Sequence, residues 1–170
     1  TINVAPFDSE FQPWGNGDIE QPGTAQKLDA IPMVLMYRLQ WRDFGTHQSL
    51  AANHTVDVNG NDHAGIRWYE LRKTAANFTL HDQGTYAPDS DHRWMGSVSL
   101  DANGNMALAY SVSGTSTFPS IRYTGRYAND APGTMTFAEE TVAIGSGAQT
   151  SLNRFGDYAQ MQVDPVAPNQ

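Results

Sequence analysis

The sequence contains no cysteine, which excludes disulfide bonds, thiol catalysis and zinc sites built on cysteine. Basic side chains are scarce: 10 lysines and arginines stand against 18 aspartates and glutamates, and the formal net charge is −8. An acidic chain without lysine or arginine runs lacks the electrostatic footprint of a nucleic-acid-binding protein. No apolar run reaches membrane-spanning length, so we expect neither nucleic acid nor a membrane as a partner.

Charged residues make up only 16% of the chain, while asparagine, serine, threonine, glutamine and glycine are frequent. This balance is typical of secreted β-rich proteins, so we expect an extracellular location. The chain begins at Thr1 without an initiator methionine or a signal sequence, which indicates a processed or excised piece. Its 170 residues suffice for one domain with a core or for several small repeats.

Two segments repeat one pattern, in which Asp-x-Asn-Gly-Asn lies between two β-type runs: "TVDVNGNDHAGIRWYEL" (55–71) and "SLDANGNMALAYSVS" (99–113). Asn-Gly is the strongest short hairpin signal, because a type I′ turn needs positive φ at both central positions. The two turns begin at Asp57 and Asp101, 44 residues apart. A period of about 40 to 45 residues matches a four-stranded propeller blade. Each hairpin is therefore predicted to be half of a blade whose neighbours cover its faces.

The remaining turn signals predict an all-β chain without a convincing helix. Residues 1–28 are predicted to be irregular and residues 29–170 to form a β-propeller-like domain. At about 40 to 50 residues per blade the chain holds three to four blades, whereas closed propellers have about four to eight. We therefore expect a small propeller, or a partial ring completed by a second copy or a complementary fragment. A β-sandwich is the alternative fold, and a short helix is the alternative for residues 30–44. The strands are expected at residues 30–44, 47–58, 64–73, 77–87, 93–101, 105–113, 120–128, 134–144 and 154–164.

Several longer phrases carry a resemblance to a known group of proteins. They are "MYRLQWRDFGTHQSLAANHTVDV", "GIRWYELR", "QGTYAPDSDHRWMGSVSLDANGNMALAYSVS", "PSIRYTGR" and "RFGDYAQMQVDP". Together they resemble a recurrent segment of large secreted bacterial proteins, similar to the sialidase-like (BNR-type) β-propeller group. The resemblance implies a propeller fold, an extracellular setting and a longer ring, but no activity. The Asp-box of active sialidases, Ser-x-Asp-x-Gly-x-Thr-Trp, is absent, because "SLDANGNMAL" lacks its Thr and Trp, so no catalytic residue is carried over.

A set of arginines gives the most informative candidate site. Innermost propeller strands converge on an axis, so arginines on several blades are expected to meet in one central pocket. Such a cluster would bind a carboxylate or sulfate, as in a sugar acid, through bidentate hydrogen bonds. The alternative is that these arginines pair with carboxylates or carbonyl groups between blades. The arginines are Arg67, Arg93, Arg122, Arg126 and Arg154.

Aromatic residues beside these arginines are candidates for stacking on sugar rings. The alternative is that they fill the space between blades. The candidate ligand-binding aromatics are Trp68, Trp94 and Tyr123, and Trp14 and Trp41 share the same two interpretations.

Catalytic and metal-binding patterns are weak. Glycoside hydrolysis needs two carboxylates, or a tyrosine nucleophile with an acid. The best pairs are Tyr69 with Glu70 and Asp157 with Tyr158, but neighbouring residues of a strand face opposite sides of a sheet. The Asp-x-Asn-Gly-Asn turns only partly match a calcium loop, and hairpin geometry explains them. We expect no cofactor, with a calcium ion in loops such as "APDSDH" as the alternative. The histidines form no paired metal motif: His47, His54, His63, His81 and His92.

The sequence thus predicts a non-catalytic β-propeller module of a secreted bacterial protein that binds a glycan or a protein partner. The alternative is an enzyme, a divergent sialidase-type glycoside hydrolase. Three converging arginines beside a Tyr–carboxylate pair would favour the enzyme.

Overall fold

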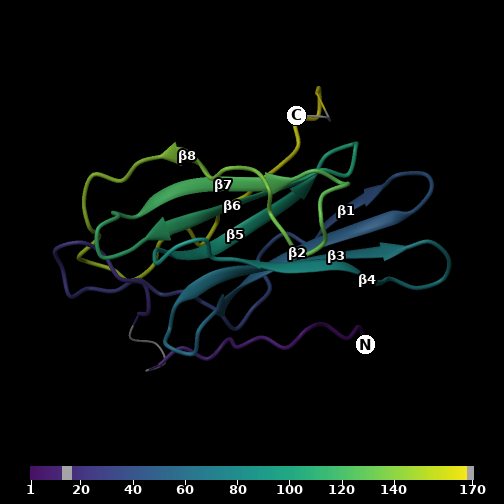
Figure 1. Ribbon diagram of the computed structural model, residues 1–170. Helices are drawn as coiled ribbons and strands as arrows, with labels where there is room; N and C mark the ends of the chain where they lie inside the picture. Colours follow the sequence, from purple (N-terminus) through teal and green to yellow (C-terminus); the bar gives the residue numbers. More distant parts are fainter. Residues whose placement is uncertain (13–16, 168–170) are drawn as a thin grey trace.

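The computed structural model describes residues 1–12 and 17–167. Within them lie eight strands and no helix, which confirms the predicted all-β class. Two antiparallel sheets, each with its strands in chain order, form the two layers seen in Figure 1. The first sheet contains β1 (Gln40–Asp43), β2 (Gln48–Asp57), β3 (Ala64–Lys73) and β4 (Thr79–Tyr86), and the second contains β5 (His92–Leu100), β6 (Met106–Ser113), β7 (Ser120–Arg126) and β8 (Glu140–Ala143).

Each sheet is a four-stranded meander, as the sequence predicts for a blade, but the number of sheets differs from the prediction. The described part of the chain forms two sheets, not three or four, and no closed ring. Two packed antiparallel sheets are the arrangement of a β-sandwich, the predicted alternative.

Three of the expected strands are shortened or missing. Of residues 30–44 only Gln40–Asp43 is strand, and of residues 134–144 only Glu140–Ala143. Residues 154–164 form no strand. A strand needs a neighbour that takes its backbone hydrogen bonds. Residues 154–164 instead contact a sheet side chain: the Met161 N–H donates to Ser97 Oγ at 2.8 Å.

The two Asp-x-Asn-Gly-Asn segments form the two predicted hairpins, but not through type I′ turns. Asn59 and Asn103 do not have positive φ, whereas Gly60 and Gly104 have φ of 72° and 82°. The aspartates organise longer loops instead. Oδ1 of Asp57 accepts hydrogen bonds from the Asn59 and Gly60 N–H groups, each at 3.0 Å, and the Asp101 carboxylate caps its loop in the same way.

The two sheets are stacked so that equivalent faces of both sheets point the same way. Asn53 pairs with Trp68 in the first sheet, and Ser97 pairs with Ala109 in the second. The repeat makes Asn53 in the first sheet equivalent to Ser97 in the second. Their cross-strand partners, Trp68 and Ala109, are therefore equivalent positions as well. Trp68 faces the second sheet and packs in the core between them, with Val98 and Leu108 among its members. Ala109 is next to Leu108 and therefore points the opposite way, so corresponding faces of the two sheets point in one direction.

Irregular chain covers part of each outer face. Along the first sheet run the N-terminal residues, visible below β2 and β3 in Figure 1. The Ala5 N–H donates to Gln83 Oε1 at 3.0 Å, and the ring of Phe7 meets that of His54 edge-on at 4.7 Å. Residues 1–12 and 17–28 contain no strand. They supply buried core side chains that pack with Trp94 and Met95, namely Phe11, Ile19 and Leu28.

Candidate functional site

Arg93 is the centre of a buried ion-pair network. Its side chain is 0% exposed, and it donates to Asp89 Oδ1 at 2.7 Å and to Glu139 Oε1 at 2.9 Å. Arg122 Nη1 donates to Glu139 Oε2 at 2.7 Å, and the Tyr110 hydroxyl donates to Glu139 Oε1 at 2.6 Å. Burial alone would raise the pKa of Glu139, but the hydrogen bonds from Arg93, Tyr110 and Arg122 lower it overall. Arg93 and Arg122 are therefore neutralised within the fold.

This network partly meets the condition set for an enzyme, because two arginines lie beside a Tyr–carboxylate pair. It leaves no room for a sugar: Tyr110 is 1% exposed, and Arg93 is fully buried. Burial and the neighbouring Glu139 raise the pKa of the Tyr110 hydroxyl, so it stays protonated and bonded. The geometry is that of a structural cluster, in which the charges satisfy one another.

Two further arginines are also paired. Arg126 forms an ion pair with Asp82, and its guanidinium lies 5.4 Å from the centre of the Trp68 ring. Arg154 is 54% exposed and pairs with Asp157 at 2.6 Å. The structure therefore does not bring the five predicted arginines into one pocket. It places four of them in ion pairs at three separate places, with Arg93 and Arg122 sharing Glu139, as the alternative interpretation of the sequence has it.

The candidate aromatic residues fall into two groups, one buried and one exposed. Trp68 and Trp94 are each 0% exposed and fill the core, so neither ring has a face free for a sugar. Trp41 is 56% exposed, and Tyr123 is 37% exposed on β7. Trp14 lies outside the described residues.

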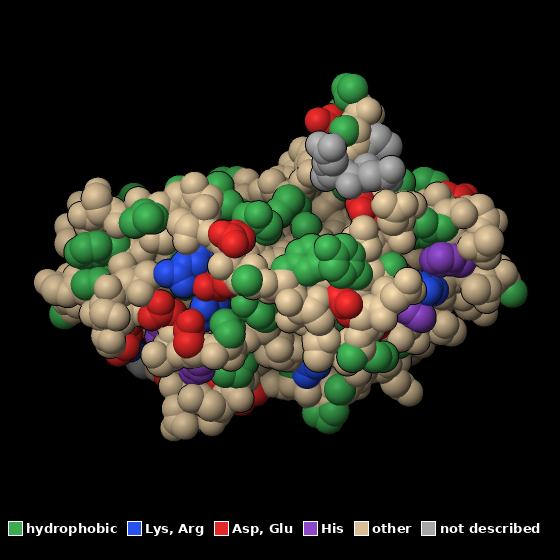
Figure 2. Space-filling model, turned by 45° about the horizontal axis from the view of Figure 1, so that its top comes forward, with side chains coloured by type: hydrophobic (Ala, Val, Ile, Leu, Met, Phe, Trp, Pro, Cys, Tyr) green, Lys and Arg blue, Asp and Glu red, His purple; other side chains and the backbone are tan. Residues whose placement is uncertain are grey.

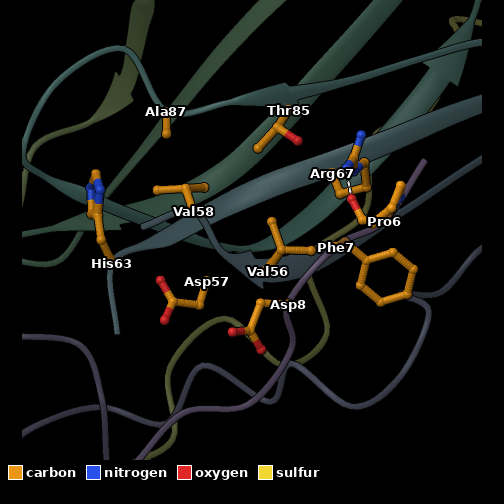
Figure 3. A pocket seen from close by; sticks show the side chains of 10 residues that line it. All are labelled: Pro6, Phe7, Asp8, Val56, Asp57, Val58, His63, Arg67, Thr85 and Ala87. Carbon is orange, nitrogen blue, oxygen red and sulfur yellow. Dashed lines mark hydrogen bonds between the residues drawn. The ribbon is translucent and has the colours of Figure 1, made fainter. Parts of the chain in front are cut away.

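Arg67 is the remaining arginine, and it lines a cavity of about 550 Å³ between the N-terminal segment and the outer face of the first sheet (Figure 3). β3 places Arg67, and β4 places Thr85, beside the end of β2. Pro6, Phe7 and Asp8 form the opposite wall. The volume lies within the range of about 300 to 1,000 Å³ usual for small-molecule sites.

The donors of Arg67 are only partly used. Its Nη2 donates to the Pro6 carbonyl oxygen at 2.9 Å, and its Nε is buried without a partner. Among the side chains that the structure describes, no carboxylate forms an ion pair with it. What sets it apart from the other four arginines is the lack of a carboxylate partner, since Arg122 and Arg126 also have a buried Nε without a partner.

The rest of the cavity supplies acceptors and an apolar ring. Asp57 uses its carboxylate to organise the β2–β3 loop. Asp8 Oδ1 accepts a hydrogen bond from the Glu10 N–H at 2.8 Å. Phe7 is 47% exposed. A guanidinium, two carboxylates and an exposed aromatic ring suit a ligand that has one acidic group, several hydroxyls and an apolar surface.

One histidine lines this site, and a second, buried histidine packs against it. His63 lines the cavity, and its ring meets that of His92 edge-on at 5.5 Å. His92 Nδ1 accepts the Ala64 N–H at 3.2 Å, so this nitrogen is unprotonated. Burial, reinforced by His63, lowers the pKa of His92 to about 4.

The stability of the protein is therefore expected to fall in mild acid. The unfolded chain protonates this imidazole below about pH 6.5, and the folded chain only near pH 4, so its contribution is fully present above pH 6.5 and is lost toward pH 4. The loss is about 3 kcal/mol. The variant His92→Asn keeps an acceptor for Ala64, and we expect it to flatten this dependence. His54 and His81, whose pKa values burial also lowers, remain in both proteins. Urea unfolding at pH 7 and pH 4.5 measures the difference, and equal slopes for both proteins would contradict the assignment.

Comparisons with protein-family models, with curated proteins and with solved structures found no match. Across residues 1–12 and 17–167, no helix has the length and apolar character needed to cross a membrane. The same ranges hold no group of three or more His, Asp or Glu side chains placed to bind a metal ion. In the loop "APDSDH", the Asp89 carboxylate is occupied by Arg93 and by the Asp91 N–H.

Proposed function

We propose that the chain is a non-catalytic binding module of a secreted bacterial protein, and that it binds an acidic sugar unit of a glycan in the Arg67 cavity. We further propose that its two sheets are consecutive blades of a β-propeller-type stack. The observation that carries the binding proposal is the state of Arg67. Four of the five candidate arginines are paired with carboxylates, whereas Arg67 lines a cavity and forms no ion pair with a carboxylate of the described residues.

The chemistry of the cavity supports a uronic acid. A guanidinium binds a carboxylate through two parallel hydrogen bonds, which a neutral sugar does not offer. The carboxylate of Asp8 is an acceptor for sugar hydroxyls, and the exposed ring of Phe7 suits the apolar side of a pyranose. Thr85 adds a hydroxyl beside Arg67 (Figure 3).

The stacking direction supports the blade proposal. In a stack of identical blades, each sheet packs its inner face against the opposite face of the preceding one. Trp68 and Ala109 are equivalent positions: Trp68 faces the second sheet, whereas Ala109 faces away from the first, as such head-to-tail stacking requires. β5 packs across β2 and β3. The segment 154–164, which was expected to be a strand but forms none, touches the outer face of the second sheet through Met161 and Ser97.

Calorimetric titration with trigalacturonate tests the binding proposal. We expect the wild-type protein to bind it, to leave it unhydrolysed, and to bind neutral maltotriose at least tenfold more weakly. Arg67→Gln should weaken binding by about 10- to 100-fold, because a hydrogen bond to a charged group contributes about 1.5 to 3 kcal/mol. Arg154→Gln, which removes an exposed arginine outside the cavity, is the matched control and should bind as the wild type does. Equal affinity of Arg67→Gln and the wild type would contradict the proposal.

A further inference from the structure

We propose that the chain has a second binding site, a slot on the outer side of the second sheet that takes a small aromatic amine, meaning an aromatic ring that carries an ammonium group. The slot is a cavity of about 310 Å³ beside the β5–β6 turn. It shares no lining residue with the Arg67 cavity and is independent of both the sugar site and the blade arrangement.

Small side chains form the floor of the slot. Ser99 and Ala107 line it, are cross-strand partners, and face outward from the second sheet. Gly125 of β7 pairs with Ala107 from the other side. The neighbouring residues Leu100 and Leu108 point the opposite way and are fully buried in the core between the sheets. This alternation of small outward and large inward side chains leaves space above the sheet that the covering chain does not fill.

An aromatic wall stands on this floor. The Thr136 and Phe137 N–H groups both donate to the Gly125 carbonyl oxygen at 2.9 Å. They hold the Phe137 ring so close to the sheet that a Cβ on Gly125 would lie 2.9 Å from it. The Tyr127 ring meets Phe137 edge-on, with the ring centres 4.6 Å apart, and Tyr127 is 59% exposed. The wall is therefore positioned by the backbone, and its outer ring is accessible to a ligand.

The chain after β8 supplies a second, aliphatic wall. Met161 and Val163 line the slot, and both are half-buried. The Met161 N–H donates to Ser97 Oγ at 2.8 Å, which fixes this segment to the outer face of β5. A thioether and a branched aliphatic side chain beside two aromatic rings suit a flat apolar ring. The volume also lies within the range of about 300 to 1,000 Å³ usual for small-molecule sites.

The β5–β6 turn adds hydrogen-bond acceptors to these apolar walls. Asp101 Oδ1 accepts the Asn103 and Asn105 N–H groups, each at 2.8 Å, and Oδ2 accepts Asn105 Nδ2 at 2.7 Å. A carboxylate has about four lone-pair positions, so one is left for a ligand. Asn105 Oδ1 accepts the Ala128 N–H at 3.1 Å and has a second lone pair. Two oxygen acceptors at this turn suit a ligand group that only donates hydrogen bonds, as an ammonium does.

The charge of the slot selects a cation over an anion. Asp101 is the only charged residue among the described side chains that line it. Arg38 lines an adjoining cavity of about 160 Å³ and not this one. Figure 2, in which the upper layer of Figure 1 is turned forward, shows hydrophobic side chains gathered on this face with aspartate or glutamate side chains beside them. An ammonium gains from the carboxylate and from the aromatic rings, whereas a ligand carboxylate would be repelled.

Three probes with the same ring and different charge test this selection. They are 2-phenylethylamine, which is an ammonium at pH 7, neutral 2-phenylethanol and anionic phenylacetate. Each is titrated into the ¹⁵N-labelled full chain and followed by amide chemical shifts. We expect the amine to bind with a Kd of about 1 mM or lower. The alcohol and the acid should bind at least about fivefold more weakly. The shifts should cluster at the β5–β6 turn, Tyr127, Phe137 and residues 161–163.

Two variants separate the charge from the aromatic wall. Asp101→Asn keeps an oxygen for the turn but removes the charge, so the affinity for the amine should fall to that for the alcohol. Tyr127→Ala should weaken binding of both probes. Glu140→Gln removes an exposed carboxylate outside the slot and is the matched control for Asp101→Asn; it should bind the amine as the wild type does. If Asp101→Asn loses the wild-type circular dichroism spectrum, Tyr127→Ala decides alone.

Three results would each overturn the second site: no binding of the amine, equal affinity for the three probes, or shifts centred outside the slot. Asp101→Asn leaves the Arg67 cavity intact, so it should bind trigalacturonate as the wild type does. Loss of trigalacturonate binding by Arg67→Gln with unchanged amine binding would show that the two sites are separate. Failure of one site therefore leaves the other standing.

Discussion

Arg93→Met is expected to lower the free energy of unfolding by about 3 to 5 kcal/mol, the range measured when one partner of a buried ion pair is removed. The substitution leaves Glu139, whose side chain is 14% exposed, without two of its hydrogen bonds. Asp89 suffers less, because its side chain is 51% exposed and water can replace the arginine. Urea unfolding followed by tryptophan fluorescence measures the change.

Two comparisons isolate the buried charge as the cause. Arg154→Met removes an exposed arginine from its ion pair and should change stability by less than about 0.5 kcal/mol. Adding Glu139→Gln to Arg93→Met removes the stranded charge and should recover part of the loss. If Arg93→Met unfolds at the same urea concentration as the wild type, the network does not stabilise the fold. Arg93 and Arg122 would then again be candidates for ligand binding.

Trp68→Ala is expected to destabilise the protein by about 3 to 5 kcal/mol, because it empties a large volume between the sheets. Trp68 is fully buried in the core cluster, and the Arg126 guanidinium lies over its ring. The position of Gly84 shows how closely the ring is enclosed, since a Cβ there would lie 2.8 Å from the Trp68 ring. Differential scanning calorimetry measures the effect.

Trp41→Ala is the matched control, because it removes the same side chain from an exposed position and should change the stability of the monomer by less than about 0.5 kcal/mol. Equal losses for the two variants would mean that the space between the sheets is not the main core.

The all-β class and the two hairpins were predictable because their signals are local. An aspartate three residues before a glycine organises each loop through its own carboxylate, as Asp57 does with the Asn59 and Gly60 N–H groups. The extent of the edge strands was not predictable. Residues 134–144 have strand-like composition throughout, but only Glu140–Ala143 pairs with β7 as a strand, while the Thr136 and Phe137 N–H groups both donate to one β7 carbonyl, that of Gly125.

The division of the arginines could not be predicted either. The alternation of Arg67 with Trp68 along one strand indicates that the two face opposite sides, but it does not say which side holds a carboxylate. Arg93 meets Glu139 from 46 residues away, and Arg126 meets Asp82 from 44 residues away. The cavity wall formed by Phe7 and Asp8 comes from a segment without periodicity, which carries no signal of its contact with β2.

We propose that ligands bind at the Arg67 cavity and not at the Arg93 network. A titration of ¹⁵N-labelled protein with trigalacturonate, followed by amide chemical shifts, distinguishes the two places. We expect the shifts to cluster at residues 6–8, at the end of β2, and at Arg67 and Thr85. Shifts centred on Arg93, Tyr110 and Arg122, or no shifts at all, would contradict it.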